Sequence, residues 1–159
     1  MFNAIYRKLC CWCALASLFL LPLPVSAATA TGEAWLDLGK SALGQLYADT
    51  NSVRPYKQGG QMYVSISAWE KYTNPDFLVK MRATPGLEDF SSELVMYMFE
   101  LNNQGRYFVA GRYFLDSKEL VCQELPPEPN IKYVGKNPEL RKLYIVAMKV
   151  ARKQAQTQR

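Results

Sequence analysis

Residues 62–69 are the feature that most constrains how this chain can fold, because apolar and other side chains alternate there without a break. Every second residue from Met62 to Ala68 is apolar, and the residues between them, from Tyr63 to Trp69, are polar or aromatic. Successive side chains of a strand point to opposite faces, so this pattern predicts a strand with one face in a core and one partly in contact with water. Such a strand needs neighbours to pair with and a second layer to cover its apolar face.

Several other runs have strand composition and are bounded by turn residues. The expected strands are residues 34–38, 45–48, 62–69, 94–99, 106–115 and 119–125. Asp49–Ser52 is predicted to be a turn and Gln58–Gln61 a loop between strands, because Asp, Asn, Ser and Gly favour such positions. Residues 71–89 form a long excursion, in which 77–81 fit either a strand or one helical turn. The prolines of residues 126–129 are predicted to keep the chain extended and to end the sheet.

The last element has the clearest helix signal. Asn137 is a suitable N-cap, and Pro138 suits the first helical position, where its missing N–H is not needed. We expect a helix over residues 138–155 with its apolar side chains in one stripe. The stripe residues are Leu140, Leu143, Tyr144, Ala147, Met148 and Ala151. Together these elements predict an α+β domain, an antiparallel sheet of about six strands with the C-terminal helix packed on one face.

The first 27 residues are expected to be a cleaved signal peptide. Residues 7–8 are basic, and residues 14–23 form a short apolar run. Residues 25–27, Val-Ser-Ala, then give the small-x-small pattern that a signal peptidase cuts, and residues 28–30 offer a second site. We therefore expect residues 28–159 to be exported as a single domain, to the periplasm, the cell surface or the medium.

Signal cleavage changes the chemistry of the mature chain. It removes three cysteines and leaves Cys122, which is expected either in the core or paired between molecules. Loss of Arg7 and Lys8 leaves 17 basic residues against 14 acidic ones, a net charge of +3, which does not indicate a nucleic-acid partner. No later segment of the sequence is apolar for long enough to cross a membrane, so no integral membrane segment is expected after cleavage.

Catalytic chemistry is not expected. The chain contains no histidine, which removes the commonest general base together with most nucleophile pairs and zinc sites. No phosphate-binding glycine loop is present, and neither a cofactor nor a metal is expected. The local acidic groups are Glu88 and Asp89 with Glu93, and Asp116 with Glu119. Both groups flank turns, where solvated carboxylates are ordinary, so a carboxylate-based glycan hydrolase is the least favoured function.

Aromatic side chains on the predicted outer face are the strongest indication of function. Tyr63 and Trp69 share one strand face, and Tyr107 and Tyr113 are expected to share another. Tyr and Trp bury large areas yet keep a polar tip, and with Arg they are common anchors at protein interfaces. The alternative is that another layer, either residues 71–89 or a partner subunit, covers these rings. The candidate partner-binding residues, which include the basic back of the C-terminal helix, are Tyr63, Trp69, Arg106, Tyr107, Arg112, Tyr113, Lys142, Lys149, Arg152 and Lys153.

A series of short motifs runs through residues 34–125. The motifs are Trp35, Tyr47-Ala48-Asp49-x-x-Ser52-Val53, a glycine-rich turn, Val64-Ser65-Ile66, and Leu94 to Glu100 followed by Arg106-Tyr107. They resemble the surface-adhesin protein E family of small exported bacterial proteins, and the chain departs from that family's pattern in its single mature cysteine and its long 71–89 segment. The resemblance implies a small exported domain that adheres to host proteins, in which these motif residues shape the fold and carry no chemistry.

The sequence thus predicts an exported, non-catalytic, adhesin-like binding protein. Its partner is expected to be a protein or an anionic glycan, engaged through an aromatic and basic surface. The alternative is a structural subunit or homodimer of a bacterial envelope assembly, in which the same aromatic side chains are buried between subunits.

Overall fold

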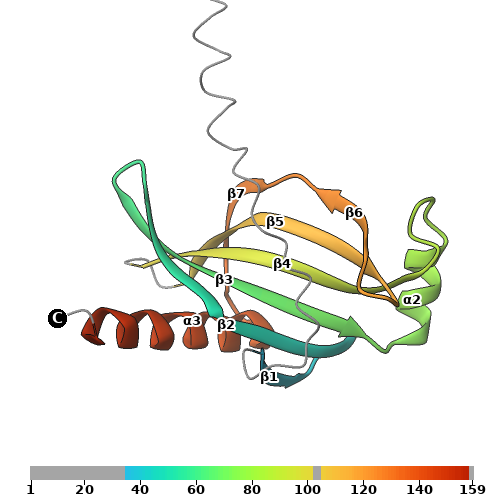
Figure 1. Cartoon of the computed structure of the whole chain (residues 1–159), viewed down its shortest axis with the longest axis horizontal. Helices are drawn as coiled ribbons and strands as arrows, with labels where there is room; N and C mark the ends of the chain where they lie inside the picture. The colour runs from blue at the N-terminus through green and yellow to red at the C-terminus, as the bar shows by residue number, and fades with distance from the viewer. Residues whose placement is uncertain (1–34, 102–104, 158–159) are drawn as a thin grey trace, which may run out of the picture.

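The computed structural model describes residues 35–101 and 105–157, which form one sheet of seven antiparallel strands and two helices (Figure 1). The strands are β1 (Trp35–Lys40), β2 (Gly44–Gln58), β3 (Gln61–Tyr72), β4 (Phe90–Glu100), β5 (Arg106–Asp116), β6 (Val121–Leu125) and β7 (Glu128–Tyr133). The helices are α2 (Pro75–Arg82) and α3 (Pro138–Thr157). The predicted α+β class, with an antiparallel sheet and a C-terminal helix, is confirmed. The expected signal peptide, residues 1–27, lies outside the described residues.

The strands follow one another in chain order from β1 to β6, and β7 adds a seventh strand beside β5. β6 pairs with the second half of β5, where Arg112 lies opposite Leu125, and β7 pairs with the first half, where Arg106 lies opposite Tyr133. The prediction that residues 126–129 end the sheet is therefore wrong. Proline lacks only an N–H donor, and an edge strand has one side on which that donor is not required, so a proline-containing segment can continue the edge.

Residues 49–54 form an irregularity inside β2, whereas the sequence predicted a turn at Asp49–Ser52. The register of β2 against β3 shifts between Asp49 and Arg54, as in a β-bulge. Asp49 Oδ1 accepts a hydrogen bond from Asn51 N at 2.9 Å. Ser52 Oγ donates to Asp49 O at 2.7 Å and accepts from Ser67 N at 2.7 Å. The polar side chains thus satisfy the backbone locally, as turn residues do, but β2 continues to the hairpin at Gly59-Gly60.

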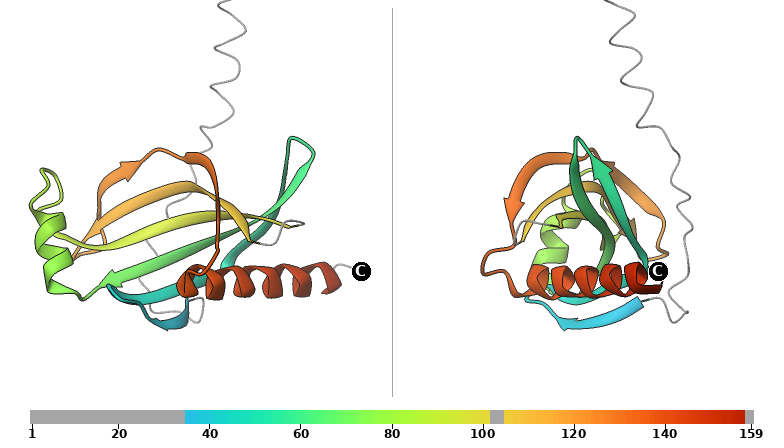
Figure 2. Two further views of the ribbon diagram at one scale, coloured as in Figure 1. Left: turned by 180° about the vertical axis from the view of Figure 1, so that it is seen from behind. Right: turned by 90° about the vertical axis from the view of Figure 1, so that its left-hand side faces the viewer.

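The main core lies between the concave face of the curved sheet and α3, which runs along it (Figure 2). The expected stripe of α3 faces inward, with Leu143, Ala147 and Met148 buried. The sheet contributes the inward-facing residues of four strands to the same cluster, and these include Ala48, Val53, Val64, Ile66, Ala68, Val95, Phe99, Tyr107 and Val109. Asn137 caps the helix as expected, because its Oδ1 accepts a hydrogen bond from Leu140 N at 2.9 Å.

A second, smaller core lies at one end of the sheet under α2. It contains Tyr72, Leu87, Phe90 and Phe114, with Phe77, Leu78 and Met81 of α2 packed against it. Residues 77–81 are therefore helical, which decides between the two structures that the sequence allowed. The cause is visible at the start of the helix, where Asn74 Oδ1 accepts from Phe77 N at 3.0 Å and Pro75 occupies the first turn.

Replacing Leu143 by Ala should lower the free energy of unfolding by about 2–5 kcal/mol, because the change leaves a cavity between α3 and the sheet. Leu143 is 1% exposed. Ile145→Ala is the matched control on the same helix, since Ile145 is 56% exposed, and it should change the value by less than about 0.5 kcal/mol. Urea unfolding of both variants measures the difference, and equal values for the two would show that α3 is not packed as described.

Candidate functional site

Large side chains form a row across the convex face of the sheet, the face opposite α3. Tyr47 of β2 lies opposite Trp69 of β3, Trp69 opposite Leu94 of β4, and Leu94 opposite Tyr113 of β5. The neighbouring residues Ala48, Ala68 and Val95 belong to the α3 core, so strand alternation directs the row away from it. Among the described residues, the apolar side chains that pack with α2 and α3 belong to the two cores and not to this row.

Trp69 is the centre of the row and is more buried than a surface anchor would be. Its ring meets Trp35 edge-on at 5.5 Å and lies 6.2 Å from Tyr47, and Lys71 Nζ stands 3.9 Å from its centre. Only 4% of Trp69 is exposed, so the prediction that its side chain is in contact with water is wrong. Its neighbours on the convex face cover it. Its Nε1 is buried without a hydrogen-bond partner within the described part of the chain. Trp35 and Tyr47 are half-buried and form the accessible part of this end of the row.

Tyr113 ends the row on β5, whereas Tyr63 and Phe108 lie further along the strands, towards the β2–β3 hairpin; all three are half-buried. The Tyr113 ring lies over Gly111, where an added Cβ would stand 3.5 Å from the ring. Burial and the carboxylate of Glu124 raise the pKa of the Tyr113 hydroxyl, so it stays protonated and can donate a hydrogen bond at neutral pH. Tyr63 and Phe108 pack edge to face at 5.4 Å. These side chains and the Trp69 cluster lie on the same face of the sheet, with Ser65 and Ser67 between Tyr63 and Trp69 on β3.

Tyr107 does not share the face of Tyr113, contrary to the prediction from its spacing. Met96 lies opposite Gly111 whereas Tyr97 lies opposite Val109, so Ala110 is an extra residue in β5. An extra residue shifts the side-chain alternation by one and turns all preceding side chains to the other face. Tyr107 is consequently buried in the core of α3, 5.8 Å from the ring of Phe99.

The two arginines of β5 are also separated by this bulge. Arg106 lies on the convex side, where its Nη1 is 3.4 Å from Oε2 of the buried Glu100. Arg112 lies on the concave side, beside Val95 of the core, with Nε 3.9 Å from Glu93 Oε1 and Nη2 3.5 Å from Glu128 Oε1. Arg106 can therefore contribute to a convex surface, whereas Arg112 cannot.

The concave side holds a polar cluster that the sequence analysis missed, between the two apolar cores. Glu70 of β3 lies directly opposite Glu93 of β4, with Arg112 nearby and Ser41 Oγ donating a hydrogen bond to Glu70. The Glu93 side chain is 13% exposed, so the prediction that it is solvated at a turn is wrong. Burial raises the pKa of the Glu93 carboxyl, Arg112 lowers it, and the facing Glu70 raises it again. Two carboxylates at facing strand positions repel each other, and the guanidinium group of Arg112, which lies on β5 beside Glu93, offsets part of that repulsion.

The tyrosines around this cluster also titrate abnormally. Burial, followed by the nearby carboxylate of Glu93, raises the pKa of both Tyr72 and Tyr97. A perturbed group of this kind can mark a catalytic site, but structural ion pairs perturb pKa values in the same way. Arg112 is paired with two carboxylates, as in a structural ion-pair network, although its Nε has no hydrogen-bond partner within the described part of the chain. Within the described ranges no group of three or more His, Cys, Asp or Glu side chains could hold a metal ion.

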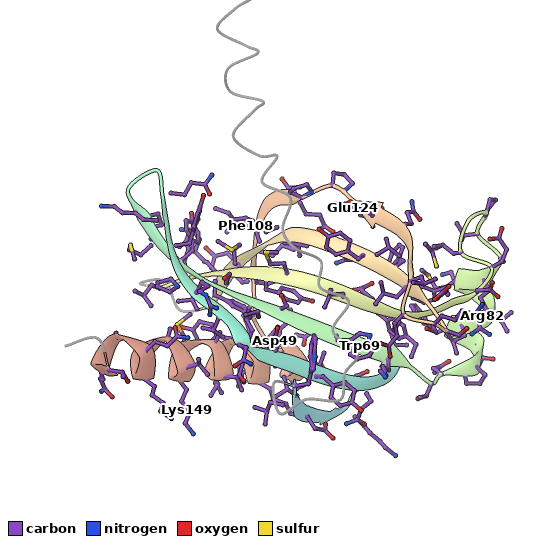
Figure 3. All side chains as sticks on the ribbon, in the orientation of Figure 1. Asp49, Trp69, Arg82, Phe108, Glu124 and Lys149 are labelled. Carbon is purple, nitrogen blue, oxygen red and sulfur yellow. The ribbon has the colours of Figure 1, made fainter. Side chains whose placement is uncertain are left out.

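The basic residues of α3 lie on a different layer from the aromatic row. Lys142, Lys149, Arg152 and Lys153 are all exposed, and Figure 3 shows Lys149 on the side of the helix that points away from the sheet. Lys142 Nζ donates to Leu38 O at 2.8 Å and so also ties α3 to β1. The predicted aromatic and basic surface is thus two surfaces, on opposite layers of the molecule.

Cys122 is half-buried against the second core, beside Leu125. Burial and the carboxylates of Asp116 and Asp89 raise the pKa of its thiol, which lowers the share of reactive thiolate. Asp116 itself caps the β5–β6 turn, where its Oδ1 accepts hydrogen bonds from Lys118 N at 2.8 Å and Leu120 N at 2.9 Å.

Comparison with known proteins leaves the resemblance noted above as a prediction. No family model matches the sequence, and no characterised protein or solved structure matches it significantly. Neither of the helices in the described part of the chain is long and apolar enough to cross a membrane.

Replacing Glu93 by Gln should change stability in a pH-dependent manner. The folded state holds the Glu93 proton more tightly than the unfolded chain does, so this group makes the wild type less stable as the pH rises above the ordinary value of 4.5. Glu93→Gln removes this pH-dependent loss of stability. The free energy of unfolding of the variant minus that of the wild type should therefore be larger at pH 7 than at pH 4. Urea unfolding at both pH values measures it.

Glu88→Gln provides a control of opposite sign. The Glu88 carboxylate accepts a hydrogen bond from Gly86 N at 2.9 Å, which lowers its pKa, so its contribution to stability is present at neutral pH and lost in acid. The same pH trend in both variants would show that Glu93 is not perturbed as described.

Proposed function

We propose that the protein is an exported, non-catalytic binding protein that engages a partner protein through the convex face of its sheet. The observation that carries this proposal is the row Tyr47, Trp69, Leu94 and Tyr113, which crosses four neighbouring strands on the face opposite α3. We call the convex surface formed by Trp35, Tyr47, Trp69, Leu94, Met96 and Tyr113 the aromatic face.

The composition of the aromatic face differs from that of an ordinary solvated sheet face. An antiparallel sheet with one wet face normally alternates apolar residues inside with polar residues outside. Here Ser65 and Ser67 share the outward face of β3 with Tyr63 and Trp69, and the facing positions of β4 include Leu94 and Met96. Aromatic side chains bury about 150–250 Å² each and are enriched among the residues that dominate protein interfaces. Covering this surface with a protein partner is therefore energetically favourable compared with leaving it exposed to water.

The proposal that the protein does not catalyse a reaction rests on its residues. The chain has no histidine. The carboxyl of Glu93, whose pKa is raised by burial, is within ion-pair distance of Arg112, so a structural ion pair accounts for its position.

A second copy of the chain is the alternative occupant of the aromatic face. Two sheets can pack face to face about 10 Å apart, with their apolar side chains interdigitating. In that case the protein would be a homodimer or a structural subunit of an envelope assembly, and its mass in solution would be twice that of the chain. Sedimentation at several concentrations separates the two cases.

Replacing Tyr113 by Ala should weaken capture of the partner by about 1–3 kcal/mol, because it removes an accessible ring from the aromatic face. Trp35→Ala should act in the same direction. Trp69 is a poorer probe, since its burial means that Trp69→Ala would also unfold the protein in part. The measurement is a quantitative pull-down from envelope extracts and from a panel of host matrix proteins, with each variant as bait.

Tyr56→Ala is the matched control for that experiment. Tyr56 is 51% exposed on the projecting β2–β3 hairpin, beyond the row. Its loss should leave capture unchanged. Unchanged capture by Tyr113→Ala and Trp35→Ala, with both variants folded, would mean that the aromatic face is not the binding surface.

Export is proposed on the pattern of residues 25–27 and is tested separately. When the full chain is expressed in a bacterium, the exported protein should begin at Ala28 or, if the second site is used, at Thr31. Replacing Ala27 by a bulky residue such as Phe should stop cleavage at the first site. N-terminal sequencing by mass spectrometry of the extracytoplasmic fraction measures both, and retention of the uncut chain in the cytoplasm would contradict the proposal.

A further inference from the structure

Positive charge is concentrated in two segments of the chain that contain no carboxylate. Residues 140–157 hold five basic residues, and residues 50–69 hold two, with no Asp or Glu in either segment. Residues 86–128, by contrast, hold eight acidic residues against three basic ones. The modest net charge of the protein therefore conceals an uneven distribution, and local charge decides what a surface attracts.

The two basic segments meet at one end of the molecule. The β2–β3 hairpin projects beyond the last β3–β4 pair, Tyr63 with Glu100, and residues 54–60 at its tip are all exposed. Figure 1 shows the C-terminal half of α3 at the same end of the sheet, diverging from the hairpin. Gln154 Nε2 donates to Val53 O at 3.2 Å and so joins the helix to the base of the hairpin. We call this end the basic fork, formed by Arg54 and Lys57 on the hairpin and by Lys149, Arg152 and Lys153 on α3.

The helix arm of the basic fork has a shallow, open hollow whose lining is mostly apolar, with three polar or cationic side chains at it. Val150, Lys153, Gln154 and Thr157 line it, one turn apart along α3. The amide of Gln154 and the hydroxyl of Thr157 are groups that hydrogen-bond sugar hydroxyls, and Lys153 attracts an acidic group.

We propose that the basic fork is a binding site for a linear anionic polysaccharide, one that carries sulfate or carboxylate groups. Five cationic side chains without an intervening carboxylate in either segment match a chain of repeated negative charges. This site lies apart from the aromatic face and does not depend on it.

A membrane surface is the less favoured partner of the basic fork. An amphipathic helix binds a bilayer by burying its apolar face among the lipids. The apolar stripe of α3 is buried instead against the sheet, with Leu143, Ala147 and Met148 inside the core. The outward side of α3 carries the exposed Lys149, Arg152 and Lys153, and Ile145 is the one large apolar side chain exposed on the described part of this helix, so it offers no apolar stripe to lipid.

The experiment compares charge reversal at the basic fork with the same reversal elsewhere. Lys149→Glu with Lys153→Glu changes two sites on α3, and Lys80→Glu with Lys118→Glu changes two exposed lysines at the α2 end. Both double variants alter the net charge equally. Binding to heparin, to neutral dextran and to vesicles of phosphatidylserine and phosphatidylcholine is measured for each by calorimetry or sedimentation at several salt concentrations.

The wild type should bind heparin, with an affinity that falls as salt rises, and should not bind dextran. The α3 variant should lose about tenfold or more in heparin affinity, which is about 1.4 kcal/mol, whereas the α2-end variant should lose less than about twofold. The double variant Lys149→Gln with Lys153→Gln keeps the helix propensity and should also lose heparin affinity. Circular dichroism checks that each variant is folded.

Two results would overturn the proposal. Equal losses of heparin affinity in both Glu variants would mean that net charge alone governs binding. Binding to vesicles without binding to heparin would mean that the basic fork binds a membrane surface instead of a polysaccharide. Tyr113→Ala should leave heparin binding unchanged, so failure of the aromatic-face proposal and failure of this one are distinguishable.

Discussion

The packing of α3 into the concave face of the sheet is the interaction on which the rest of the structure depends. Ala48 and Ala68 lie opposite each other on β2 and β3, and with Ala147 of the helix they belong to one buried cluster. Small side chains at these positions let the helix approach the strands closely, while the larger Leu143 and Met148 fill the space on either side. Because the helix occupies one face of the sheet, both the aromatic face and the cationic side of the helix are turned outward, in opposite directions.

Local sequence patterns, which involve only residues close together in the chain, correctly predicted β3 and the start of α3. The alternation at residues 62–69 gave the faces of β3 correctly, and Asn137 followed by Pro138 gave the start of α3. These signals act through backbone geometry within a few residues, so they survive in any tertiary context. They were enough to predict the sheet, the helix and the face of the sheet that each side chain of β3 occupies.

The errors arose where long-range pairing overrides the local pattern. The extra residue Ala110 exists only relative to β4, and without knowledge of that register Tyr107 was placed on the wrong face. Glu93 resembles a turn residue in the sequence but lies opposite Glu70 and near Arg112, which come from two other strands. Of the three charged residues in the polar cluster on the concave face, only Arg112 lay inside a predicted strand, whereas Glu70 and Glu93 lay just outside the predicted strands 62–69 and 94–99. Nothing in the local sequence connects the three.

The break in the outer strand beside β5 has a consequence for how the molecule can associate. An uninterrupted edge of this length would present a continuous ladder of free backbone groups, on which another chain could be added as a further strand. Pro126 and Pro127 divide the edge into pieces of five and six residues, and each proline withholds a donor. The sheet can therefore present its aromatic face to a partner while this edge resists edge-to-edge addition of further strands. Such resistance limits fibre formation by a protein that has many apolar side chains outside its core.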